Sequence, residues 1–75
     1  MAFNKVFVDY KDDKERVKLY PNVRKACLDF DIPPSLIKRK YNEMYTAGTP
    51  DISFNVAAQD LINRKSRGKN LFDIS

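Results

Sequence analysis

The chain has 75 residues, of which 43% are hydrophobic and 32% are charged, a composition typical of one small folded domain and not of a disordered chain. It has one cysteine and no histidine, which excludes an intrachain disulfide, the commonest general base and the commonest zinc ligand. The formal net charge is +4, and residues 32–75 hold seven Lys or Arg against four Asp or Glu, an excess that suits a surface for polyanions. A solvated basic surface is the alternative.

A β-hairpin is predicted over residues 3–20. In FNKVFVDY, Val6, Val8 and Tyr10 alternate with other residues, and in RVKLY valine and leucine alternate in the same way. The polar segment KDDKE between these runs suits a hairpin loop of about five residues. Because two strands alone are only marginally stable in water, one side of the hairpin must pack on helices.

A first helix is predicted over residues 23–30, with Asn22 as its N-cap. Its apolar residues recur at the spacing i, i+3, i+4 and i+7, which gives one stripe of Val23, Ala26, Cys27 and Phe30. A free cysteine in such a stripe usually acts as a small apolar residue. Ile32 precedes a proline, and because that position disfavours helical geometry, the helix should end before it.

A second helix is predicted over residues 34–45, since Pro34 is tolerated in a first helical turn. Its buried stripe contains Ile37, Tyr41 and Met44. The opposite side carries four residues of the types that a DNA-reading helix uses for bases and phosphates, namely Ser35, Lys38, Arg39 and Asn42. A solvated helix surface explains the same charges, but the break before this helix favours the binding interpretation.

A third helix is predicted over residues 53–64, after the loop TAGTPD. Asp51 and Ser53 are its candidate N-caps, and its apolar stripe consists of Phe54, Ala57, Ala58, Leu61 and Ile62. The run ISFNV also alternates, so a short strand is the competing prediction. The continuation AAQDL favours the helix.

A basic C-terminal tail is predicted over residues 64–75, after a single small domain of residues 1–63. The cations that could lie along a phosphate backbone are Arg64, Lys65, Arg67 and Lys69. A frayed tail without a partner is the alternative. A small apolar anchor follows these cations, formed by Leu71, Phe72 and Ile74.

These elements together predict an α+β fold, in which a two-stranded hairpin packs on a three-helix unit that contains a helix-turn-helix. We expect a single core that draws on the hairpin and on all three helices. Its predicted members are Val6, Val8, Val17, Leu19, Val23, Ala26, Cys27, Phe30, Ile37, Tyr41, Leu61 and Ile62.

The segment LYPNVRKACLDFDIPPSLIKRKYN, residues 19–42, resembles the nuclease-associated modular helix-turn-helix of homing endonucleases and of small phage-type DNA-binding proteins. In that family a capped helix of the form Ser/Asn-Ile/Val-Arg-x-Ala-Ala/Cys leads through a Gly-Ile-Ser turn into a helix containing Ser-x-Ile-Arg/Lys-Arg. The matching positions here are Asn22, Val23, Arg24, Ala26, Cys27, Ile32, Ser35, Ile37, Lys38, Arg39 and Asn42. The resemblance implies DNA binding through the second helix, with Ser35, Lys38, Arg39 and Asn42 as contacts.

Two positions depart from the family pattern. Asp31 stands where the family usually has glycine, and the pair Pro33-Pro34 is unusual at the start of the second helix. Both lie in the turn, so the geometry of the turn decides whether the second helix is presented as in the family.

We therefore expect a small DNA-binding protein of phage or mobile-element type, with double-stranded DNA as its partner. The alternative is a small phage-type protein-interaction module that binds a host factor or a virion component and no nucleic acid. The two differ in salt dependence, because phosphate contacts weaken steeply as ionic strength rises.

No enzymatic activity, cofactor or metal is expected. The acidic cluster of Asp9, Asp12, Asp13 and Glu15 lacks the ligand spacing and the glycine of an EF-hand loop, so a solvated hairpin loop is the better interpretation. The segment MAFNKVFVDYK lacks the apolar core of a signal peptide, and the chain has no run long enough to span a membrane. We expect a cytoplasmic protein that does not bind membranes.

Overall fold

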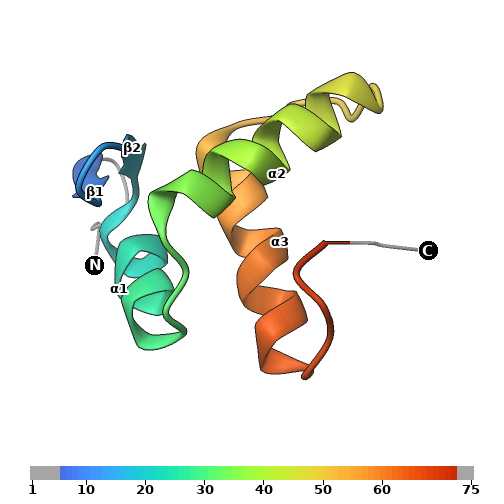
Figure 1. Ribbon diagram of the computed structural model, residues 1–75. Helices are drawn as coiled ribbons and strands as arrows, with labels where there is room; N and C mark the ends of the chain where they lie inside the picture. Colours follow the sequence, from blue (N-terminus) through green and yellow to red (C-terminus); the bar gives the residue numbers. More distant parts are fainter. Residues whose placement is uncertain (1–5, 73–75) are drawn as a thin grey trace.

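The computed structural model describes residues 6–72 and has an α+β fold, as predicted: an antiparallel β-hairpin followed by three helices (Figure 1). Residues 3–5 of the predicted hairpin and Ile74 of the predicted anchor lie outside the described residues. In chain order the elements are β1 (Val8–Lys11), β2 (Arg16–Leu19), α1 (Pro21–Asp29), α2 (Pro34–Thr46) and α3 (Phe54–Ser66).

The hairpin pairs Tyr10 with Val17 and Val8 with Leu19, so these four side chains share the side that packs on the helices. Tyr10, Val17 and Leu19 are buried, and Val8 is partly buried. Val6 was predicted to join this side, but it precedes β1 and is 67% exposed. The alternation therefore predicted a strand here but placed its start too early, since Val6 and Phe7 precede β1.

The first helix begins at Pro21, two residues before the predicted start. Tyr20 is the N-cap in extended conformation, and no side chain caps the helix. Asn22 was predicted as the N-cap, but it lies inside the helix because Pro21 occupies the first helical position. Proline suits that position, since its fixed φ is helical and its missing N–H would have had no partner.

Asp31 adopts the left-handed conformation, with φ of 61°, directly after the C-cap of α1. The Ile32 N–H donates to the Cys27 carbonyl at 2.9 Å, and the Asp31 N–H donates to the Leu28 carbonyl at 3.3 Å. These two bonds form a Schellman motif, in which glycine is the usual left-handed residue. The turn therefore has the backbone conformation that glycine would give, and α2 leaves it in a new direction (Figure 1).

The other two helices end in the same way, with the left-handed residue supplied by Gly48 after α2 and by Gly68 after α3. Ser53 is the N-cap of α3 and its hydroxyl accepts a hydrogen bond from the Val56 N–H at 3.3 Å. The competing strand over ISFNV does not form, because α3 begins at Phe54. The helix continues to Ser66, two residues past its predicted end.

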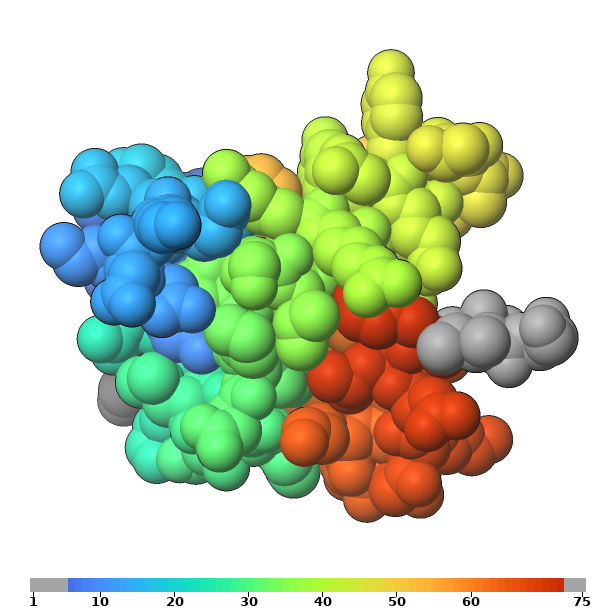
Figure 2. Space-filling model, viewed as in Figure 1, coloured from blue at the N-terminus to red at the C-terminus, as the bar shows by residue number. Residues whose placement is uncertain are grey.

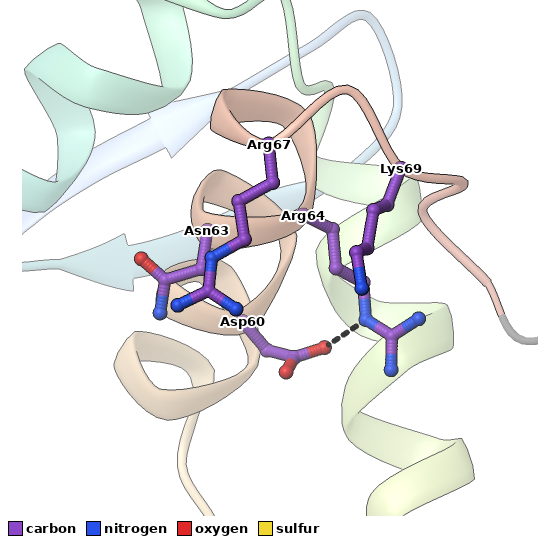
Figure 3. Close-up of a pocket in the computed structure, with 5 residues that line it drawn as sticks. All are labelled: Asp60, Asn63, Arg64, Arg67 and Lys69. Carbon is purple, nitrogen blue, oxygen red and sulfur yellow. Dashed lines mark hydrogen bonds and ion pairs between the residues drawn. The ribbon is translucent and has the colours of Figure 1, made fainter.

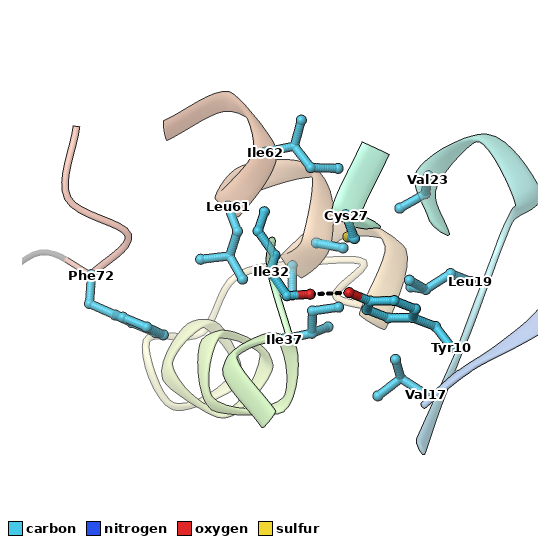
Figure 4. Close-up of a cluster of buried hydrophobic side chains, with 12 residues drawn as sticks. Tyr10, Val17, Leu19, Val23, Cys27, Ile32, Ile37, Leu61, Ile62 and Phe72 are labelled. Carbon is cyan, nitrogen blue, oxygen red and sulfur yellow. Dashed lines mark hydrogen bonds between the residues drawn. The ribbon is translucent and has the colours of Figure 1, made fainter. Parts of the chain in front are cut away.

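The core lies where the hairpin, the three helices and the C-terminal segment meet (Figure 4). α3 is its centre, since α1, α2 and β2 all contact this helix. Ala26, Phe30 and Tyr41 were predicted as core members and are only partly buried, whereas Ile32 in the turn is fully buried. The buried apolar residues are Tyr10, Val17, Leu19, Val23, Cys27, Ile32, Ile37, Ala57, Ala58, Leu61, Ile62 and Phe72.

Candidate nucleic-acid interface

Four residues of α2, at the spacing i, i+3, i+4 and i+7, share one side of the helix. We call this set the α2 face: Ser35, Lys38, Arg39 and Asn42. All but one are exposed, and Lys38 is partly buried. The Lys38 ammonium lies 3.0 Å from the Glu15 carboxylate of the hairpin loop, an ion pair between half-exposed side chains. The hairpin loop thus borders the α2 face. Lys38, one of the four residues of this face, already has an acidic partner.

Arg39 contacts the C-terminal segment. Its guanidinium carbon lies 4.3 Å from the centre of the Phe72 ring, within the range of a cation–π contact. Phe72 is 8% exposed and belongs to the core, so the segment after α3 is folded back onto α2 through this residue. The predicted apolar anchor therefore exists at Phe72, and it connects the α2 face to the region predicted as a basic tail.

Lys40 is a buried cation that the sequence interpretation missed. Its side chain is 3% exposed, and its ammonium lies 2.8 Å from the Glu43 carboxylate and 3.5 Å from that of Asp60. The ammonium is also 5.0 Å from the centre of the Phe72 ring. The signal was available, because Lys40 follows Ile37 by three residues and precedes Met44 by four, within the buried stripe.

The second predicted group of cations we call the C-terminal basic cluster: Arg64, Lys65, Arg67 and Lys69. It is not one tail, since Arg64 and Lys65 form the last turn of α3 and only Arg67 and Lys69 follow it. Arg64 pairs with Asp60 at 3.0 Å, an i, i+4 ion pair whose spacing could have indicated it. Lys65, Arg67 and Lys69 are exposed and form no ion pair within residues 6–72.

A surface hollow of about 420 Å³ lies at the C-terminal end of α3 (Figure 3). Its lining residues are Asp60, Asn63, Arg64, Arg67 and Lys69. Three cations thus meet one carboxylate, and that carboxylate is already paired with Arg64 and Lys40. The lining of the hollow therefore carries a net positive charge.

The α2 face lies beside the segment that follows the C-terminal basic cluster. Figure 2 shows the first half of α2 (green) next to the segment that follows α3 (red) on one face of the protein. The contact between Arg39 and Phe72 joins the two regions. The hairpin loop (blue) borders α2 on the other side, in agreement with the ion pair of Lys38 and Glu15.

The remaining candidates for chemistry are the Cys27 thiol and the acidic residues of the hairpin. Burial raises the pKa of the Cys27 thiol to about 11, so this buried thiol stays protonated and unreactive at neutral pH. In the hairpin, Asp9 lies 3.6 Å from Lys18 and 4.0 Å from Arg16, so cations neutralise it. Within residues 6–72, no three His, Cys, Asp or Glu side chains are grouped closely enough to hold a metal ion.

No known protein family, curated protein or solved structure matches the chain. None of the helices in the described part is long and apolar enough to cross a membrane.

Proposed function

We propose that this protein binds double-stranded DNA, with the α2 face in the major groove and the C-terminal basic cluster on the phosphate backbone. The observation that carries the proposal is the contact between Arg39 and Phe72, which holds the segment after the C-terminal basic cluster against the α2 face. Arg can donate to guanine or phosphate, and Asn can pair with adenine through two hydrogen bonds. The proposal includes no catalytic step.

The turn supports this role for α2. The family that the segment resembles usually has glycine at the position of Asp31, and Asp31 takes the left-handed conformation that glycine adopts readily. The double proline then sets the start of α2 at Pro34, with Pro33 as an extended N-cap. Ser35, Arg39 and Asn42 consequently lie exposed along α2, which at 13 residues is about 20 Å long.

A titration against duplex DNA at two salt concentrations tests the proposal. Affinity should fall steeply between about 50 and 200 mM salt, because phosphate contacts release counterions. Arg39→Ala should lose about 1–3 kcal/mol of binding free energy and relax sequence preference. Lys65→Ala should weaken all sequences alike and lower the salt slope by about one.

Lys25→Ala is the matched control, since it removes the same charge from α1, where Lys25 pairs with Asp29 and with no other carboxylate of residues 6–72. It should bind nearly as the parent does. If Lys25→Ala and Lys65→Ala weaken binding equally, net charge and not this surface explains the affinity. If the parent binds no duplex even at low salt, the protein-interaction alternative replaces the proposal.

A further inference from the structure

Five aromatic side chains from four segments of the chain form a second surface, which we call the aromatic row: Phe7, Tyr20, Phe54, Tyr41 and Tyr45. Phe7 stacks on Tyr20 with ring centres 4.6 Å apart and planes 17° apart. Tyr41 contacts Phe54 at 4.9 Å and lies parallel to Tyr45 at 6.4 Å. Phe7 is 47% exposed and Tyr45 is 68% exposed, so both ends of the row are open to solvent.

A hollow of about 390 Å³ connects the two groups of rings, because Phe7, Tyr20 and Phe54 all line it. Its volume is within the range of pockets that hold small molecules, about 300–1,000 Å³. The first turn of α3 is held at this place by a hydrogen bond from the Tyr20 N–H to Asn55 Oδ1, at 2.9 Å. This bond holds the Tyr20 and Phe54 sides of the hollow together, and aromatic rings form half of its lining.

The remaining lining residues are a cation and two hydrogen-bonding groups: Lys18, Ser53 and Asn55. Lys18 is 69% exposed, with its ammonium 3.6 Å from the Asp9 carboxylate. Asn55 uses its oxygen for the Tyr20 N–H, which leaves its NH₂ group as a donor, and the Ser53 hydroxyl can also donate. The hollow thus combines aromatic walls, donors and a positive charge, and none of its described lining residues is a carboxylate.

We propose that this hollow binds an unpaired nucleobase, with Lys18 beside the attached phosphate, so that the protein also binds single-stranded nucleic acid. Bases stack on exposed aromatic side chains whatever their sequence, and a nearby cation attracts the backbone. Tyr41 and Tyr45 continue the row beyond the hollow and offer further rings for neighbouring bases. A proline-rich peptide also fits aromatic grooves. Lys18 and the net charge of +4 favour the negatively charged ligand.

The test compares two fluorescein-labelled strands of about twelve nucleotides, an oligothymidylate and a fully abasic strand of the same charge. The parent should bind the oligothymidylate about tenfold more tightly, because only that strand has bases to stack. Phe7→Leu removes the ring but keeps an apolar side chain, so it should lose most of this difference. Leu28→Ala changes an exposed apolar residue of α1 outside the row and should keep the difference.

Equal affinity of the parent for the two strands would overturn this inference, and so would an unchanged difference in Phe7→Leu. Binding of an oligoproline peptide that is lost in Phe7→Leu, with no preference for the strand with bases, would assign the hollow to a peptide. Duplex binding is measured in parallel, and Phe7→Leu should leave it unchanged because paired bases cannot enter the hollow. The inference and the proposed duplex function can therefore fail separately.

Discussion

The Tyr10 hydroxyl donates a hydrogen bond to the backbone carbonyl oxygen of Ile32, which ties β1 to the turn between α1 and α2 (Figure 4). Both residues are buried, at 7% and 0% exposure. Burial is the main cause that raises the pKa of Tyr10, so the hydroxyl stays protonated and can donate at neutral pH. The hairpin therefore fixes the turn that sets the direction of α2.

Removing this hydroxyl should destabilise the protein. We expect Tyr10→Phe to lower the free energy of unfolding by about 1–3 kcal/mol, because the Ile32 carbonyl is left buried without its partner. Tyr45→Phe is the matched control. Tyr45 is 68% exposed, so removing its hydroxyl leaves no buried group without a hydrogen-bond partner. Urea unfolding measures both variants. Equal stability of the two would show that the bond to Ile32 contributes nothing.

Alkaline pH should destabilise the protein through Cys27. Burial raises the pKa of its thiol from 9.0 to about 11, so the folded state holds the proton more tightly than the unfolded state. The resulting stability is complete below pH 9.0 and is lost as pH rises through about 11, by an amount on the order of 2 kcal/mol. Unfolding of Cys27→Ala should show a flatter decline across this range. A parallel decline in both proteins would contradict the assignment.

Replacing Asp31 with glycine should stabilise the turn. Asp31 has φ of 61°, a conformation that costs an L-residue about 1–2 kcal/mol and glycine almost nothing. Since glycine also loosens the unfolded chain, we expect a net gain of about 0.5–1 kcal/mol for Asp31→Gly. Asp31→Asn, which removes the charge but tolerates the same conformation, should change stability little. Thermal unfolding distinguishes the variants, and a lower melting temperature for Asp31→Gly would refute the role given to the turn.

The hairpin loop should weaken DNA binding. The Glu15 carboxylate forms an ion pair with the Lys38 ammonium, which places a negative charge beside the α2 face. Glu15→Gln should therefore raise duplex affinity, most clearly at low salt where exposed charges are least screened. Asp51→Asn removes the same charge from the loop between α2 and α3 and should have a smaller effect. An equal gain in both variants would attribute the effect to net charge alone.

Periodicity was sufficient to predict the hairpin and the three helices, because each depends on residues close together in the sequence. Pro21 indicates the true start of α1, because proline favours the first helical position, whereas the N-cap preference of Asn22 predicts a start two residues later. The burial of Val6 was overestimated, since alternation does not show where a strand leaves the core. The conformation of Asp31 could not be derived, because aspartate tolerates left-handed geometry but adopts it in only a minority of positions.

The candidate interface was less predictable than the fold. The exposed side of α2 follows from helical spacing, but its neighbours come from distant parts of the chain. Glu15 reaches Lys38 from the hairpin loop, and Phe72 reaches Arg39 from beyond α3. Contacts of this kind depend on how the elements pack, which local patterns do not determine. The aromatic row was missed for the same reason, since four separate segments supply its rings.

The most direct test of the α2 face is a map of amide chemical shifts in nitrogen-15-labelled protein, titrated with a short duplex at low salt. The account predicts that the largest changes fall on residues 35–42 and 64–72, and that the amides of α1 around Lys25 change little. Largest changes in the aromatic row would indicate binding through unpaired bases at frayed ends and would contradict groove binding by α2. Absence of any change at saturating duplex would contradict DNA binding altogether.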